Sequence, residues 1–172
     1  MHFEKRFNLS KIIPKNESRV HLNNAYLDTE NNRLIATDGH KLVIIPVTID
    51  DGDTPGPVST EAIKAAIKAA GKTGDAGITC KTDLAVWNGA TYPRPEKMEY
   101  PDVDKVIPKP AAVHIVIDAR LLADVQVAMG CNHGVNLQFA VNDDGSINSQ
   151  AAVRVTALGD DRPIAVIMPL RV

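Results

Sequence analysis

Short runs of β-branched and aliphatic residues recur along the chain and predict β-strands. Turn-forming residues separate the first of these runs, at Glu30-Asn31-Asn32 and at Asp38-Gly39. The runs cover residues 19–29, 33–39, 40–47, 77–82, 83–90, 113–117, 135–141, 151–158 and 164–172. Their short length and close spacing are typical of antiparallel sheets.

Two segments have helical periodicity instead. In residues 59–72, Ser59 or Thr60 can cap the helix and Gly71 is placed to end it. One side of this helix is apolar and should pack against a sheet, whereas lysines follow one another at spacings of four on a second stripe. These lysines are Lys64, Lys68 and Lys72. The second helix is expected over 119–129, between a capping Asp118 and Gly130.

The order strand–helix–strand–strand–strand occurs at 56–99 and again at 112–172. The two copies share the pattern but little sequence identity. Sheets of antiparallel strands with one helix packed on each unit indicate an α+β fold. We therefore expect a first domain over 1–99, a proline-rich connector over 100–111 and a second, smaller unit over 112–172.

Composition narrows the class of protein. The chain has 172 residues with 44% hydrophobic residues, which is enough to bury a core, and a net charge of −2, so no overall basic field indicates nucleic acid. No apolar run is long enough to span a membrane, and the first ten residues lack a signal-peptide core. The two cysteines, Cys80 and Cys131, do not form a disulfide framework, which predicts a cytoplasmic protein.

Candidate catalytic and metal sites are weak. The phosphate-binding, dinucleotide-binding, zinc-protease and paired-cysteine motifs do not occur in the sequence. Cys131 and His133, with His114, are the nearest set of metal ligands, but they are better explained as incidental polar residues. The acidic residues of 50–53 lack the spacing of a calcium loop and predict a solvated turn. His40 has no identifiable nucleophilic partner. We therefore predict that the protein is not an enzyme and uses no cofactor.

Three short segments resemble one known family. They are ATDGHKL (36–42), YPDVDKVIP (100–108) and AVIMPLRV (165–172). In this order, with the strand–helix pattern between them, they resemble the bacterial sliding clamp, the beta subunit of DNA polymerase III. Members of that family are longer and have three similar domains, each built from two helix-plus-strands units. The resemblance implies that 19–99 corresponds to most of the middle domain and 112–172 to half of the last. The chain would therefore be a reduced, clamp-like protein.

The resemblance also implies a binding site for short linear peptides of polymerases and related replication or repair proteins. In the family, the three segments meet in a hydrophobic pocket between the middle and last domains. An apolar groove with an adaptable methionine suits varied peptides, and nearby cations could orient them. Where Lys41 stands, family members usually have arginine. Carried over by position, the pocket residues are Leu22, Thr37, Gly39, His40, Lys41, Leu42, Pro101, Val106, Val166, Met168, Pro169, Leu170 and Arg171.

A second function implied by the resemblance is to encircle duplex DNA as a processivity factor. The positions that would contact phosphates, without reading sequence, are Lys64, Lys68, Lys72 and Arg120. A ring would require a homo-oligomer with complementary edges. One alternative is a monomeric adaptor or decoy that occupies clamp-binding peptides and does not encircle DNA. Another is an unrelated small enzyme that uses His40 or the pair Cys131 and His133.

Overall fold

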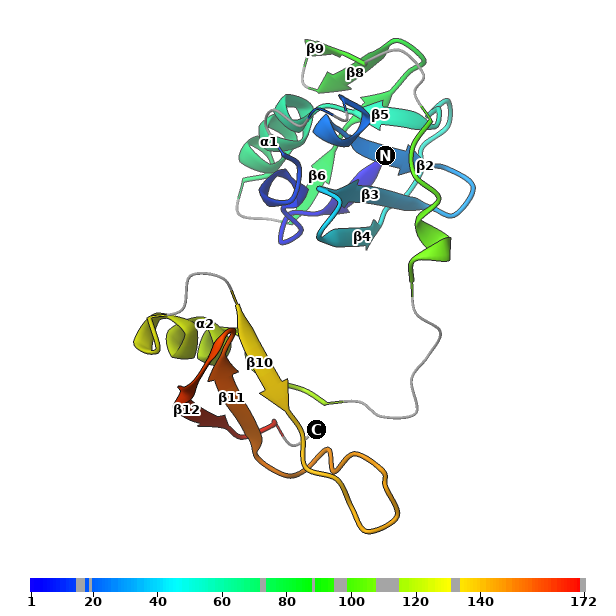
Figure 1. Cartoon of the computed structure of the whole chain (residues 1–172). Coiled ribbons are helices and arrows are strands. Elements are labelled where there is room, and N and C mark those ends of the chain that lie inside the picture. Colours follow the sequence, from blue (N-terminus) through cyan, green and yellow to red (C-terminus); the bar gives the residue numbers. More distant parts are fainter. Residues whose placement is uncertain are drawn as a thin grey trace. The chain divides into compact units, whose positions relative to one another are not determined.

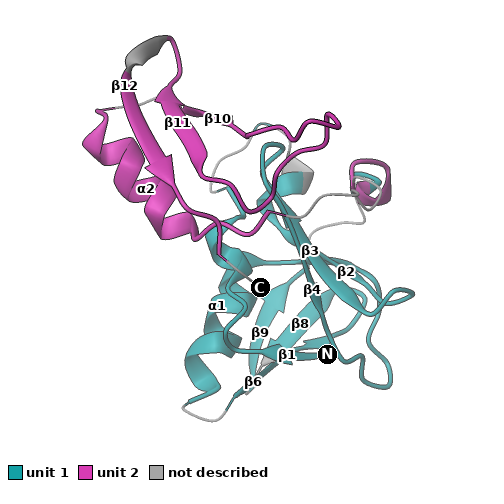
Figure 2. Ribbon diagram, turned by 90° about the horizontal axis from the view of Figure 1, so that it is seen from below, with its two compact units in different colours: residues 1–102 teal, residues 103–172 magenta. Residues whose placement is uncertain are grey.

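The structure is a computed structural model. It describes residues 1–14, 18, 20–71, 74–87, 89–94, 99–107, 115–130 and 134–170. The chain divides into two compact units, Met1–Asp102 and Val103–Val172, which are coloured separately in Figure 2. Each unit combines antiparallel strands with an α-helix, so the predicted α+β class is confirmed.

The first unit contains three small antiparallel sheets and the helix α1 (Figure 1). Its largest sheet has the strand order β4-β3-β2-β5, and the two others pair β1 with β6 and β7 with β8 and β9. The elements are β1 (His2–Glu4), η1 (Leu9–Lys11), η2 (Val20–Asn23), β2 (Ala25–Asp28), β3 (Arg33–Thr37), β4 (Leu42–Pro46), β5 (Gly56–Val58), α1 (Thr60–Ala69), β6 (Asp75–Gly77), β7 (Thr79–Cys80), β8 (Leu84–Trp87), β9 (Ala90–Pro93) and the short helix η3 (Val103–Lys105), which begins the second unit.

The helix α1 forms where its sequence predicts. The Ser59 hydroxyl accepts a hydrogen bond from the Ala62 N–H at 3.2 Å, and Gly71 follows with a φ of 58°. Ile63 and Ala66 are fully buried against the sheets. The same core takes in alternate residues of the strands, such as Leu27 and Leu34, because successive side chains of a strand point to opposite faces.

A buried arginine connects two of the sheets. Arg94, which follows β9, is 7% exposed. Its Nε donates to the Pro57 carbonyl at 2.8 Å, and its Nη1 donates to the Lys81 carbonyl at 2.6 Å. The Nη1 and Nη2 groups also donate to the hydroxyl and the carbonyl of Thr54, at 2.9 and 3.1 Å. Burial lowers the pKa of this guanidinium, because removing the charge from water is unfavourable. The hydrogen bonds to fixed oxygens offset part of this desolvation free energy.

The acidic loop over 50–53 is a turn in which Asp51 and Gly52 are exposed, as the sequence predicts, but Asp53 is not solvated. The Asp53 side chain is fully buried and accepts hydrogen bonds from the Cys80 N–H at 2.8 Å and the Asp50 N–H at 2.9 Å. It also accepts one from the Met1 ammonium group. Burial raises the pKa of Asp53, but these hydrogen bonds outweigh that effect and hold it below its ordinary value. The carboxylate therefore joins the loop to β7.

The second unit is a smaller layer of one helix and one sheet. The helix α2 (Ala119–Ala128) lies along one face of the sheet β10-β11-β12 (Figure 1). Asp118 caps it through a hydrogen bond from the Arg120 N–H at 2.9 Å, as predicted. Val153, Val155 and Ile167 are buried. The strands are β10 (Val135–Gln138), β11 (Val153–Ala157) and β12 (Asp160–Ile167).

Three strand predictions need correction. Residues 20–23 form η2, so the strand predicted over 19–29 is confined to 25–28, after the turn-forming Asn23 and Asn24. The described residues 115–117 are not in a strand and are linked to the C-terminal segment by one bond, from the Leu170 N–H to the Val116 carbonyl at 2.7 Å. The last strand is displaced, because β12 spans 160–167 and ends before Pro169, which has no N–H to donate.

The packing of Gly56 against the Arg94 guanidinium gives a stability prediction. A Cβ atom on Gly56 would lie 2.9 Å from Arg94 Nη2, and Gly56 has a φ of +136°. Gly74, with a φ of +111°, has open space at the same position. We expect Gly74→Ala to cost about 1–2 kcal/mol from backbone strain, and Gly56→Ala to cost about 1–3 kcal/mol more from crowding of the guanidinium. Urea-induced unfolding of both variants measures the difference, and equal losses would contradict the role given to Arg94.

Candidate functional site

The turn between β3 and β4 is built by its own sequence. The Asp38 carboxylate accepts hydrogen bonds from the N–H groups of His40 at 2.9 Å and Lys41 at 2.7 Å. The Thr37 hydroxyl accepts from the Gly39 N–H at 3.0 Å, and Gly39 has a φ of 84°, which glycine adopts without strain. The backbone hydrogen bonds, first of all that from His40, hold the pKa of Asp38 well below its ordinary value. The segment is therefore a rigid turn.

This turn exposes some of the residues predicted for the peptide pocket and buries others. His40 and Lys41 are exposed, and Lys41 Nζ lies 3.0 Å from a carboxylate oxygen of Asp38. Leu42 is half-buried. Thr37 is 9% exposed and Leu22 is 2% exposed, so these two side chains are not available at the surface. Of the predicted residues in the first unit, the turn therefore presents mainly polar ones.

Two tyrosines that the sequence analysis did not select lie next to the exposed Pro101. The rings of Tyr26 and Tyr100 stack with centroids 5.0 Å apart. The Tyr100 hydroxyl donates a hydrogen bond to the Ile35 carbonyl at 3.5 Å. Burial raises the pKa of Tyr100 to about 12, so the phenol stays protonated at neutral pH. These contacts fix the chain before Pro101 across the outer face of the sheet. An aromatic residue directly before proline was the signal available in the sequence.

The predicted pocket residues of the second unit are exposed and apolar. Val166 and Met168 are 62% and 57% exposed, and Leu170 is 52% exposed. Val106 is 68% exposed, whereas Pro169 is half-buried. Alternation along β12 explains the pattern, because Ile167 points into the unit and its neighbours point outward. Arg171 lies outside the described residues.

Exposed apolar side chains are unevenly divided between the two units. Among the described residues, Leu84 is the one large hydrophobic side chain of the first unit that is exposed. The second unit exposes many, including Val127 of α2, which is 81% exposed. Exposed apolar area of this extent is typical of a surface that binds something. The second unit is therefore the better candidate for apolar recognition.

The predicted phosphate contacts differ between the two helices. Lys64 and Lys68 are exposed on the side of α1 opposite its buried face, whereas Lys72 lies outside the described residues. Arg120 of α2 is exposed, but its guanidinium forms an ion pair with Asp118 at 2.7 Å. That hydrogen-bonded pair raises the pKa of Arg120. Only α1 therefore presents lysines together.

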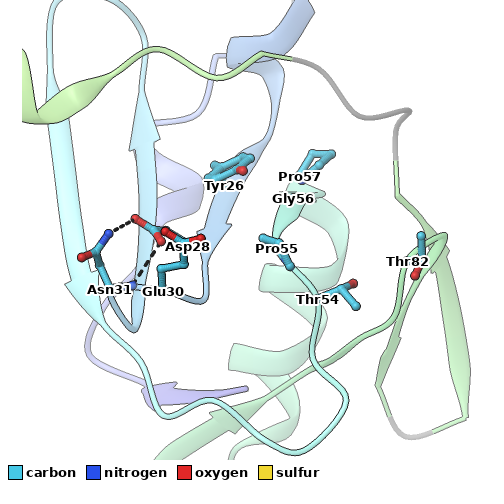
Figure 3. Close-up of a pocket in the computed structure, with 9 residues that line it drawn as sticks. All are labelled: Tyr26, Asp28, Glu30, Asn31, Thr54, Pro55, Gly56, Pro57 and Thr82. Atoms are coloured by element: carbon cyan, nitrogen blue, oxygen red, sulfur yellow. Dashed lines mark hydrogen bonds between the residues drawn. The ribbon is translucent and has the colours of Figure 1, made fainter.

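A cavity of about 580 Å³ opens on the first unit (Figure 3). The Asp28 carboxylate in its wall accepts hydrogen bonds from the Asn31 side chain at 2.8 Å and from Arg33 Nε at 2.7 Å. Burial raises the pKa of Asp28, but these bonds lower it overall. The lining residues all lie outside the predicted peptide-binding set: Tyr26, Asp28, Glu30, Asn31, Thr54, Pro55, Gly56, Pro57 and Thr82.

The structure does not support the candidate metal site or the candidate catalytic cysteine and histidines of the sequence analysis. Cys131, His133 and His114 lie outside the described residues. Within the described part of the chain, no three His, Cys, Asp or Glu side chains are grouped so that they could hold a metal ion. Cys80 is buried, and burial raises the pKa of its thiol to about 11. The helices in the described ranges are all too short or too polar to cross a membrane.

The fold matches that of bacterial sliding clamps. A DNA polymerase sliding clamp from Pseudomonas aeruginosa superposes with a TM-score of 0.63 at 17% identity, over 100% of this chain and 66% of that protein. The beta subunit of DNA polymerase from Streptococcus pyogenes superposes with a TM-score of 0.63 at 12% identity, over 99% of this chain and 50% of that protein. The polymerase III beta protein of Caulobacter crescentus superposes with a TM-score of 0.57 at 18% identity, over 100% of this chain and 65% of that protein.

The chain thus spans between half and two thirds of the length of these clamps. No protein-family model matches the sequence, and no curated protein matches it. The predicted resemblance is therefore confirmed as a clamp-like fold.

The hydrogen bonds of Asp38 predict how the exposed turn responds to mutation and to acid. Asp38→Ala removes the acceptor of the His40 and Lys41 N–H groups, so we expect their amide hydrogen exchange to accelerate several-fold. In the wild type the depressed pKa keeps the turn ordered until the pH falls well below 3.8. Nuclear magnetic resonance measures both effects. Asp51→Ala, in an exposed turn elsewhere, is the control, and unchanged exchange in Asp38→Ala would contradict this account.

Proposed function

We propose that this chain is a reduced, sliding-clamp-like protein of DNA replication or repair that binds short linear peptides of polymerases and related factors. It would act by binding and not by catalysis. The observation that supports this most is the exposure of the apolar side chains of Val166, Met168 and Leu170 in a chain with a clamp-like fold. Outward-facing side chains of this kind, without a core to fill, are those that a hydrophobic peptide would cover.

Each unit by itself offers a peptide a different kind of contact. The second unit contributes aliphatic surface, with Met168 able to adapt to different side chains. The first unit contributes the turn at 38–41, whose His40 and Lys41 side chains can meet carbonyl oxygens or carboxylates of a peptide. The rigid backbone of that turn reduces the entropy lost on binding. The aliphatic surface of the second unit would suit a short peptide with hydrophobic anchors.

A ligand of a related structure provides a direct test. One Pseudomonas aeruginosa sliding clamp, which superposes with a TM-score of 0.52 at 16% identity, is bound to griselimycin. We expect griselimycin to bind this chain and Met168→Ala to weaken that binding about tenfold, because truncation of a central apolar contact costs about 1–2 kcal/mol. Isothermal titration calorimetry of wild type and variant gives both affinities.

The matched control is Val127→Ala, which truncates another exposed apolar residue of the second unit outside the proposed site. This variant should bind griselimycin as the wild type does. Equal affinity of wild type and Met168→Ala would remove Met168 from the site. If griselimycin and polymerase peptides both fail to bind the wild type, the proposed function is wrong.

A second candidate function is DNA association through α1. Lys64 and Lys68 are both exposed on one side of this helix, which favours non-specific contact with phosphates. Lys72 continues the same spacing in the sequence. The second helix supports this function less, because Arg120 is already paired with Asp118. Tethering of a polymerase would require both DNA contact and assembly of several copies into a ring. A monomeric adaptor would need neither.

Charge reversal separates these alternatives. We expect wild type to associate with nicked circular DNA in a salt-dependent way, and the triple variant Lys64→Glu, Lys68→Glu, Lys72→Glu to lose most of that association. The control variant changes three lysines outside α1, at Lys11, Lys81 and Lys105, by the same total charge. Sedimentation at 50 and 200 mM salt, with and without DNA, measures mass and binding. If the wild type remains a monomer and does not bind DNA, the result supports the alternative of a monomeric peptide-binding adaptor.

A further inference from the structure

The two units share one segment of strand, helix and strand. The helices α1 and α2 both have ten residues and begin 59 positions apart, at residues 60 and 119. Each is followed by a glycine in the left-handed region, Gly71 with a φ of 58° and Gly130 with a φ of 65°. The same offset aligns β5 with residues 115–117 and β6 with residues 134–136, where β10 begins. Equivalent positions of the two units can therefore be compared one by one.

A backbone contact supports this alignment. In the first unit, the Pro57 carbonyl accepts a hydrogen bond at 2.8 Å from Arg94, which follows the last strand of the unit. In the second unit, the equivalent Val116 carbonyl accepts one at 2.7 Å from the N–H of Leu170, which also follows the last strand. Residues 115–117 thus take the place of β5 in the second unit.

In the first unit, strands from the other half of the same unit cover this segment. The earlier half contains β1, η1 and β2 to β4, and the later half contains β5, α1 and β6 to β9. Each half gives its first strand to the other, because β5 pairs antiparallel with β2, and β1 pairs antiparallel with β6. The core that the two halves enclose includes Val58 and Ile63, which are fully buried, and Ile78, which is 2% exposed.

The equivalent strand and sheet edge of the second unit lack such partners. Among the described residues, 115–117 pair with no strand, and β10 is an edge strand bonded only to β11. The Gly134 carbonyl accepts a hydrogen bond from the Leu158 N–H at 3.2 Å. By the alternation of an antiparallel ladder, Val135 and Leu137 therefore direct their N–H and C=O groups away from β11. The edge of β10 is open to a further strand.

Side chains at equivalent positions are buried in the first unit and uncovered in the second. Ala62 is 0% exposed and its equivalent Leu121 is 43% exposed, and Ile78 at 2% corresponds to Leu137 at 36%. No residue of α2 is buried, whereas α1 buries three. The second unit therefore has the apolar surface and the open edge of one half of a unit whose other half is not covering it.

We infer that the second unit is completed by the second unit of another copy of this chain, related to it by a two-fold axis. Residues 115–117 of each copy would pair with the β10 edge of the other, as β5 and β1 pair across the halves of the first unit. A two-fold interface must be complementary to itself, and this surface contains both the unpaired strand and the edge that receives it. The inference concerns assembly and does not depend on the proposed peptide or DNA binding.

Charge does not oppose contact between two copies. Residues 103–172 include seven acidic and six basic residues, so the unit is close to neutral. On the shared segment, Asp118 and Arg120 form an ion pair with each other. The contact would therefore be dominated by aliphatic side chains and by backbone hydrogen bonds.

Hydrogen exchange of the full chain at increasing concentration tests the strand pairing. We expect the Val135 and Leu137 amides to become protected as the concentration rises to about 100 μM, because these amides are bonded only when a second copy is present. The Asn136 amide faces β11 and should be protected at every concentration, which shows that the sheet itself is folded. Sedimentation velocity of the same samples should give the mass of two copies.

A charge at the uncovered helix surface tests the interface. Leu121→Asp should raise the dissociation constant of the dimer at least about tenfold and remove the concentration-dependent protection. The matched control is Ile164→Asp on β12, an exposed aliphatic residue outside the interface, which should change neither. A monomeric mass with exchange at Val135 and Leu137 that is independent of concentration would overturn the inference. A dimer that is unchanged in Leu121→Asp would also overturn it, because the copies would then meet through another surface.

Discussion

The first unit depends on a buried cation that is held by oxygen atoms of the backbone. Arg94 binds Pro57 and Thr54 on one side and Lys81 on the other, so one guanidinium joins the loop before β5 to the sheet β7-β8-β9. An arginine buried without these acceptors would be strongly unfavourable, so the loop and the strand ends must keep their positions together. Asp53 acts in parallel, because its carboxylate holds the same loop to β7.

This constraint also shapes the surfaces of the first unit. The loop that Arg94 holds forms one wall of the cavity, and the sheet that the loop borders carries Tyr26 and, further along, the turn at 38–41. The surface of the first unit is consequently rigid and polar at these positions. The second unit differs, because its buried residues are few and its exposed ones are largely aliphatic, including Val166 and Met168.

Local patterns in the sequence predicted those features that depend on neighbouring residues. The helix α1 begins at its Ser59 cap, and the turn around Asp38 is closed by bonds within four residues. Predictions failed where a distant group decided the outcome. Residues 50–53 resemble a solvated turn in every local respect, yet Asp53 is buried because its partners are Cys80 and the Met1 ammonium group. The spacing of acidic residues contains no information about such contacts.

Periodicity and short motifs were sufficient to predict the α+β class, the two principal helices with their caps, and the resemblance to the clamp fold, because each of these depends on neighbouring residues or on short segments. Three-dimensional contacts, in contrast, set the burial of Leu22 and Thr37, the exposure of Met168, the stacking of Tyr100 on Tyr26 and the cavity that Tyr26 lines. Burial and cavity formation depend on contacts between residues far apart in the chain. A one-dimensional pattern specifies which residues are able to make such contacts, and folding selects which of them do.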